Sequence, residues 1–273
     1  MTRTDTRPPS DRVRLDGVQA QRRLAHLWIQ GLSDLARANL PTRADDSHTA
    51  LIWEPETRAL RTAPLPTAQG PVILALGFDR LDLTFFRGGM RVGELSVAGL
   101  GVDQVQVWLD SQALALELTP GNPDARPYTL PDDLRAGSAR APLSLTALGD
   151  WFDLAHGALS ALSLEGPVFV WPHHFDMATY QTLGPGDGET APGVGLGLSP
   201  GDTLSDTPYF YVGPWPRLRA DELQPAPPRG VADPVFGGYV LRAAPLLAAP
   251  DQGGAVQAFF EAGLKMARTA RAA

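Results

Sequence analysis

The chain has 273 residues, of which 44% are hydrophobic and 19% are charged, so it can form one large domain or two small ones around a true core. Its net charge of -7 argues against nucleic acid as a partner, because a phosphate backbone requires a basic surface. The absence of cysteine excludes a disulfide framework, a thiolate nucleophile and a thiolate metal site.

The start of the chain is polar and contains proline, so residues 1–14 are predicted to be a disordered tail. It lacks the apolar core of a signal peptide, and no apolar run reaches the roughly 18 residues that a membrane helix needs. We therefore expect a cytoplasmic protein with no membrane partner. Residues 15–273 are expected to form a single α+β domain, and an arrangement in two halves, 15–118 and 143–273, is the alternative.

The first helix is predicted from Gly17 to Asn39, with Asp16 as its N-cap and Pro41 as its stop. The prediction follows from apolar residues at steps of three and four: Leu24, Leu27, Trp28, Leu32, Leu35 and Ala36. His26 lies just beside this stripe, and we interpret it as a flanking or core histidine.

Up to seven short strands are predicted to follow, in the ranges 50–54, 58–63, 71–77, 81–86, 91–98, 102–109 and 113–118. They are too closely spaced for helical crossovers, so their sheet should be mainly antiparallel. Residues 119–142 are expected to form a long loop, of the kind that is functional or mobile.

The second half of the chain predicts a helix over 145–162 and another over 254–270. Between them we expect an extended linker at 214–234 and strands at 167–171, 175–183, 193–198, 208–213 and 238–242. The predicted fold is thus α+β, with largely antiparallel sheets in a meander and about three helices packed on them. A sequence echo between the segments that begin at Gly70 and Gly166 indicates either a duplicated unit or, as we favour, chance matching of strand-like runs.

The most distinctive stretch is Trp171 to Asp176, which reads W-P-H-H-F-D. If the chain is extended here, side chains alternate between faces, so His174 and Asp176 share one face and His173 lies on the other. An aspartate beside a histidine raises the imidazole pKa and fixes its tautomer. His174 is therefore the candidate general base or metal ligand, with Asp176 as its orienter and His173 as a second donor or ligand.

A structural role for this stretch remains open as well, with His173 buried against a backbone carbonyl and Asp176 capping a turn. His-His-x-Asp is not a specific metal pattern, so we assign no metal site, and the sequence does not predict which cofactor, if any, the protein uses.

Gly197 to Gly201 matches the G-x-S-x-G pattern of a nucleophile elbow, but Pro200 and Gly201 predict a turn where an elbow needs a helix. The histidine of such a triad would also have to come last, and none follows His174. We interpret this segment as a turn from which Asp202 projects toward the histidine pair as a further catalytic candidate.

The densest aromatic group consists of Tyr209, Phe210, Tyr211 and Trp215. The two tyrosines should share one face of a strand, with Phe210 on the other. Candidate ligand-binding residues are Trp171, Tyr180, Ser199, Tyr209 and Tyr211, because amphipathic aromatic side chains suit the walls of a small-molecule site. Packing into the core is the alternative for this group.

The order W-P-H-H-F-D-M-A, S-P-G-D and P-Y-F-Y-V resembles an uncharacterised bacterial family, a domain of unknown function. That family has a core strand with a histidine-containing or similarly polar pair and Phe-Asp-Leu-Ala, followed by a Pro-Gly turn and a Phe-Tyr strand. The resemblance is clearest over residues 166–212, and Met177 stands where the family has leucine. It supports the position of the site and implies a bacterial source, but it implies no activity.

Two functions are therefore carried forward. The first is a small-molecule-binding protein or enzyme, with a cleft where the W-P-H-H-F-D strand meets the S-P-G-D turn and the tyrosine strand. The second is a non-catalytic structural or protein-interaction domain in which the same motif is a packing element. The sequence does not predict the oligomeric state.

Overall fold

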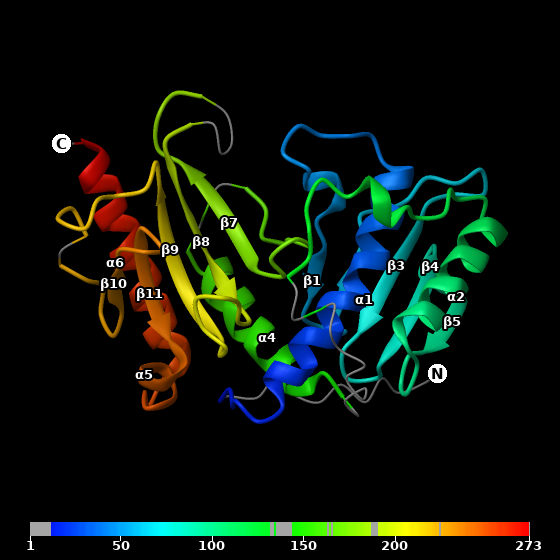
Figure 1. The fold of residues 1–273 in the computed structure, drawn as a ribbon, viewed down its shortest axis with the longest axis horizontal. Coiled ribbons are helices and arrows are strands. Elements are labelled where there is room, and N and C mark those ends of the chain that lie inside the picture. Colours follow the sequence, from blue (N-terminus) through cyan, green and yellow to red (C-terminus); the bar gives the residue numbers. More distant parts are fainter. Residues whose placement is uncertain are drawn as a thin grey trace. The chain divides into compact units, whose positions relative to one another are not determined.

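The computed structural model describes residues 12–131, 134, 144–162, 164, 166–186, 191–223 and 225–272. They form two compact units (Figure 1). The first unit contains Asp16–Gly149 and Val170–Phe175, and the second contains Ser10–Leu15, Asp150–Phe169 and Asp176–Ala273. Each unit is built on an antiparallel sheet, which confirms the α+β class predicted from the sequence.

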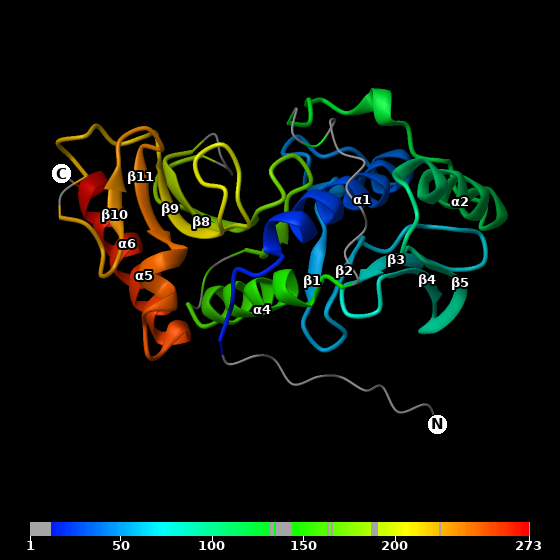
Figure 2. The same cartoon turned by 60° about the horizontal axis from the view of Figure 1, so that its bottom comes forward.

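The first unit begins with helix α1 (Val18–Asn39) and the 3-10 turn η1 (Ser47–Thr49). A five-stranded meander follows in the order β1-β2-β3-β4-β5. Its strands are β1 (Ile52–Glu54), β2 (Ala59–Arg61), β3 (Val72–Gly77), β4 (Asp82–Arg87) and β5 (Met90–Ser96). Helix α2 (Val102–Ala115) and the 3-10 turn η2 (Pro123–Ala125) complete it. Both views show α1 and α2 side by side on one face of this sheet (Figures 1 and 2).

The second unit is built on a six-stranded sheet in the order β10-β11-β9-β8-β7-β6, in which Val170 of β6 belongs to the first unit. The strands are β6 (Phe169–Val170), β7 (Met177–Thr182), β8 (Gly193–Ser199), β9 (Tyr209–Trp215), β10 (Val231–Asp233) and β11 (Gly238–Arg242). Its helices are α4 (Thr146–Ser160), whose first turn belongs to the first unit, α5 (Ala243–Leu247) and α6 (Gln252–Ala272). In the part of the chain that is described, no helix has both the length and the apolar character needed to cross a bilayer.

One face of the second sheet is closed by helices. Phe210 of β9 packs against Trp151 of α4 and Phe260 of α6, at ring-centroid distances of 6.1 and 5.8 Å. Val212, two residues further along β9, lies against Gly263 of α6. Since side chains alternate along a strand, Tyr209, Tyr211 and their neighbours in register must point to the opposite face.

The predicted helices near 17–39, 145–162 and 254–270 are all present, whereas α2 was predicted as two strands, 102–109 and 113–118. That prediction is wrong. Its apolar residues fit both periods: Val105 and Leu109 belong to an alternating run and equally to the helical stripe that Ala113 continues. The structure buries those three residues and leaves Val107, which the alternation would also bury, 70% exposed.

The start of the chain and the expected linker also differ from prediction. Of the tail predicted over 1–14, residues 1–11 lie outside the described residues. Residues 12–14 are an ordered part of the second unit. There Val13 is buried, and its N–H donates to Gln252 Oε1 at 2.8 Å. The linker expected to be extended coil contributes the end of β9 and the whole of β10.

The two units share an order of elements, a helix, then a meander, then a helix. The sequence echo does not follow that order. It aligns β3, the third strand of its sheet along the chain, with β6, the first strand of the other. Because these strands are not equivalent, the comparison favours chance matching over duplication as the origin of the echo.

The helical register of α2 can be tested with two substitutions. Leu109 lies against Gly31 of α1 and is 3% exposed, so Leu109→Ala should lower the free energy of unfolding by about 2–5 kcal/mol. Val107→Ala, at an exposed position, should change it by about 0.5 kcal/mol or less. Urea denaturation measures both, and equal losses would contradict the helix, since a strand would place the two residues on one face.

Candidate functional site

The W-P-H-H-F-D stretch is not a continuous strand. Residues 172–174 form a turn between β6 and β7, closed by a hydrogen bond from Phe175 N to Trp171 O at 2.7 Å. Phe175 has a positive φ of 59°. The alternation that placed His173 and His174 on opposite faces of a strand therefore does not apply, because it assumed extended backbone throughout.

The turn is fixed through the carbonyl of Pro172. This oxygen accepts hydrogen bonds from His26 Nε2 at 2.9 Å and from Gln30 Nε2 at 2.8 Å, both on α1. Because a carbonyl oxygen can only accept, Nε2 of His26 carries the proton. The His26 ring is 1% exposed and stacks on Phe175 at 5.3 Å, so the prediction of a core histidine is confirmed.

His173 lies half-buried among other rings of the first unit. Its ring centroid is 4.4 Å from that of His174, 5.8 Å from Tyr128 and 6.0 Å from Trp171. Burial and, to a smaller extent, the neighbouring His174 together lower the pKa of His173 from 6.5 to about 4, while Asp46 opposes the change. His173 is thus a neutral imidazole at physiological pH, and His174 is exposed.

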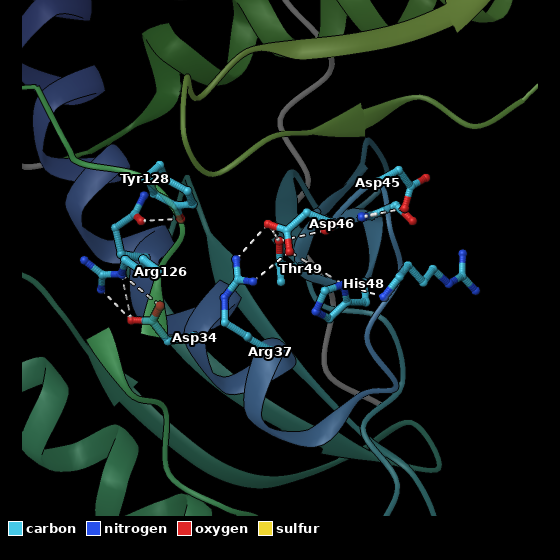
Figure 3. Close-up of polar contacts among 11 residues, drawn as sticks. Asp34, Arg37, Asp45, Asp46, His48, Thr49, Arg126 and Tyr128 are labelled. Carbon is cyan, nitrogen blue, oxygen red and sulfur yellow. Dashed lines mark hydrogen bonds and ion pairs between the residues drawn. The ribbon is translucent and has the colours of Figure 1, made fainter. Parts of the chain in front are cut away.

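A polar stripe runs along α1 beside this turn, and we define it as His26, Gln30, Asp34 and Arg37. The steps of four, four and three place these side chains on one side of the helix. Figure 3 shows the partners of its second half: Arg126 bonds to Asp34, and both terminal nitrogens of Arg37 bond to Asp46, at 2.6 and 2.7 Å.

Each charge in the polar stripe is matched by a partner from a distant loop. Asp34 is only 1% exposed, and Arg126 satisfies it through both Nε and a terminal nitrogen. Tyr128 donates to Gln30 Oε1 at 2.9 Å, and burial raises the pKa of Tyr128 to about 12. Breaking a buried ion pair typically costs about 3–5 kcal/mol, so these contacts hold the loops in place. We interpret the stripe as the scaffold of the first unit.

The S-P-G-D turn is organised around Asp202 in the second unit. Its carboxylate accepts hydrogen bonds from Ser199 Oγ at 3.1 Å, Tyr209 Oη at 2.7 Å and Leu204 N at 2.8 Å. Burial and the bond to Asp202 raise the pKa of Tyr209, so this phenol keeps its proton. Ser199 also accepts from Gly201 N at 3.2 Å, and no helix follows it. The turn itself is confirmed, whereas the catalytic role of Asp202 beside the histidine pair stays a prediction.

The other predicted aspartate is held by a tyrosine. Tyr211 Oη donates to Asp176 Oδ2 at 2.5 Å. The structure therefore forms two phenol–carboxylate pairs in the second unit, Tyr209 with Asp202 and Tyr211 with Asp176. The prediction that Tyr209 and Tyr211 share the face opposite to Phe210 is confirmed.

The predicted site residues divide between the units. Trp171, His173 and His174 belong to the first, and Asp176, Tyr180, Ser199, Asp202, Tyr209 and Tyr211 belong to the second. The pairing of His174 with Asp176 stays a prediction. Within the described residues no group of three histidine, aspartate or glutamate side chains is placed to hold a metal ion.

The open face of the second sheet has a glycine floor under aromatic rings, and we call it the aromatic face. Strand β8 reads G-V-G-L-G-L-S, so Gly193, Gly195 and Gly197 all point to this face. A Cβ atom on Gly193 would lie 2.5 Å from the Tyr180 ring, and one on Gly197 would lie 2.7 Å from the Tyr211 hydroxyl. Rings approach the backbone this closely only where no side chain intervenes.

Gly195 differs from the two glycines beside it. A Cβ atom there would meet no atom closer than 3.9 Å outside its chain neighbours, and the nearest side-chain atom is Cε2 of Tyr211 at 4.0 Å. Gly195 is also partly exposed, whereas every other residue of β8 is buried. The aromatic face therefore leaves room for a side chain over Gly195, beside the ring of Tyr211, and we call this space the opening.

Further aromatic residues complete the aromatic face. The ring of Phe236 covers Gly213 and Gly238, and Trp215, which pairs with Gly193, is 48% exposed. Sequence reasoning named Trp215 in the aromatic group but missed Phe236 and Gly195. The alternating glycines of β8 were the available signal, since glycine within a strand marks a close approach of another group.

Comparisons with known proteins add no further assignment: no protein-family model, no curated protein and no solved structure matches the chain.

The neutral state of His173 predicts a pH dependence of stability. Because its folded-state pKa of about 4 lies below the ordinary 6.5, its neutral form contributes stability above pH 6.5 that is lost as the pH falls toward 4. His173→Phe cannot take up a proton and keeps a ring beside Tyr128. Denaturation at pH 7 and pH 5 should show a larger loss for the parent than for the variant, and equal losses would contradict the assignment.

The aromatic face predicts opposite effects for two neighbouring glycines. Gly197→Ala places a methyl group 2.5 Å from Met177 O and against the Tyr211 hydroxyl, so it should destabilise the protein by about 1–3 kcal/mol. Gly195→Ala meets only ordinary contacts and should be neutral or stabilising by up to about 1 kcal/mol. Thermal denaturation of both variants checks this, and a large loss for Gly195→Ala would show that the opening is absent.

Proposed function

We propose that the chain is a small-molecule-binding protein whose ligand lies on the aromatic face, over Gly195. The observation that carries the proposal is the single break in that face: Gly195 is the only residue of β8 that is not buried, and a side chain there would meet no atom closer than 3.9 Å. Ligand sites in proteins are concave and lined by apolar and aromatic groups with a few placed polar atoms.

The rings around the opening are held before any ligand arrives. Tyr180 donates to Ala191 O at 2.7 Å, and Tyr211 donates to Asp176 at 2.5 Å. Each ring is thus fixed by a glycine beneath it and a hydrogen bond at its hydroxyl. Preorganised groups lose little conformational entropy on binding, which favours affinity for a small ligand.

Binding is favoured over catalysis by the state of the polar groups in the second unit. The phenol of Tyr209 holds its proton firmly, and the carboxylate of Asp202 accepts three hydrogen bonds from its own turn. In this proposal the W-P-H-H turn is a packing element of the first unit, fixed by the Pro172 carbonyl. The proposed binding site therefore differs from the cleft predicted from the sequence, because it lies at the tyrosine strand β9 and the glycines of β8 alone.

The test is a titration followed by two-dimensional NMR of the ¹⁵N-labelled chain. The probes are indole, phenol, choline, 3,3-dimethyl-1-butanol and methyl glucoside at millimolar concentration. We expect at least one to shift the Gly195 amide saturably, and Gly195→Leu to abolish that shift by filling the opening.

A matched control is Gly157→Leu, at an exposed position on α4 where a side chain would meet nothing within 4 Å. Helix α4 packs against the opposite face of the sheet through Trp151, so this variant should bind like the parent. The proposal is wrong if no probe shifts the Gly195 amide or if binding survives in Gly195→Leu.

A further inference from the structure

We infer that the ligand of the aromatic face is a small organic cation, with an alkylated ammonium group placed over Gly195. The inference rests on the proposed function and adds the chemical class of the ligand. Its basis is the combination of non-parallel aromatic rings with carboxylates bonded to their phenol groups.

The rings meet at steep angles, as walls do around a rounded group. The Tyr211 and Phe236 rings are 5.6 Å apart at 65°, in an edge-to-face contact, and they lie over Gly197 and Gly213, the neighbours of Gly195 along and across the sheet. A flat ligand stacks on one ring, whereas a compact cation gains from several faces because each carries the negative end of a ring quadrupole. This geometry favours a tetrahedral ammonium group over a planar ring.

The phenol–carboxylate pairs add negative charge at the rim of these rings. Tyr211 donates to Asp176 and Tyr209 to Asp202, and Asp176 also acts electrostatically on the Tyr209 phenol. Asp202 takes part in no ion pair within the described part of the chain. A hydrogen bond to a carboxylate makes a phenol ring richer in electrons, which strengthens its attraction for a cation.

Other ligand classes fit this face less well. An anion would be repelled by Asp176 and Asp202. A sugar needs several free donors and acceptors, but the hydroxyls of Tyr180, Tyr209 and Tyr211 already donate to Ala191 O, Asp202 and Asp176. A cation needs only ring faces and nearby negative charge, and this face provides both.

The experiment compares three probes of one shape that differ in charge. Choline is the cation, 3,3-dimethyl-1-butanol its neutral isostere and 3,3-dimethylbutanoate the anion. Each is titrated into the labelled chain and followed at the Gly195 amide. Cation–π contacts predict that choline binds about tenfold more tightly than the neutral isostere, and that the anion binds most weakly. Added salt should weaken only the binding of choline.

A charge variant separates electrostatics from shape. Asp176→Asn keeps an oxygen to accept from Tyr211 but removes the negative charge, so the preference for choline should fall several-fold while binding of the neutral isostere is unchanged. Asp103→Asn, at an exposed position in the first turn of α2, changes the net charge equally and should keep the full preference.

The possible outcomes distinguish the preference for a cation from the proposed binding of a small molecule at Gly195. If choline and its neutral isostere bind equally and Gly195→Leu abolishes both, the site stands and the preference for a cation is wrong. That preference is also wrong if indole or phenol binds at Gly195 and choline does not. If no probe shifts the Gly195 amide, both the inference and the proposed function are wrong.

Discussion

An aromatic ring can lie flat against a β-sheet only where the residue beneath it has no side chain, and the second sheet is built on this constraint. In β8 the residues that alternate with the glycines are Val194, Leu196 and Leu198. They are buried toward the helices, so the glycines form the floor of the other face. Tyr180 covers Gly193 and Tyr211 covers Gly197. Gly195 remains uncovered, so the same alternation creates both the packed face and its opening.

The first unit uses polar rather than aromatic contacts to fix its loops. Helix α1 is buried on most of its surface, and it buries His26, Gln30 and Asp34 of the polar stripe as well as its apolar residues. Buried polar groups are tolerated only with partners, and here Pro172, Arg126, Tyr128 and Asp46 supply them. The cost of burying these charges is offset only if all the loops are in place together, which makes the arrangement cooperative.

The local sequence pattern correctly predicted the features that depend on a single helix or strand. The long helices followed from apolar spacing, and the facing of Tyr209, Phe210 and Tyr211 followed because β9 is a regular strand. Helix α2 was missed because Val105 and Leu109 satisfy two periods at once.

The features that sequence reasoning missed depend on contacts between distant residues. The partners of the polar stripe include Arg126 and Pro172, 92 and 142 positions from the residues of α1 that they bond. The turn at 172–174 broke the alternation on which the histidine facing depended. The opening over Gly195 depends on where the rings of neighbouring strands come to rest, and no single strand encodes that.

Neither unit is encoded by one uninterrupted stretch of the chain. Residues 170–175 belong to the first unit although the second encloses them in sequence, and Val170 pairs there with Leu51. Conversely, residues 12–15 belong to the second unit, where Arg14 O accepts the indole N–H of Trp151. A fragment that ends before Val170 would lack Pro172, whose carbonyl oxygen accepts hydrogen bonds from both His26 and Gln30. Cutting the chain near its middle would therefore remove a segment from each unit. A gene for one unit alone would have to join segments that are separated in the natural sequence.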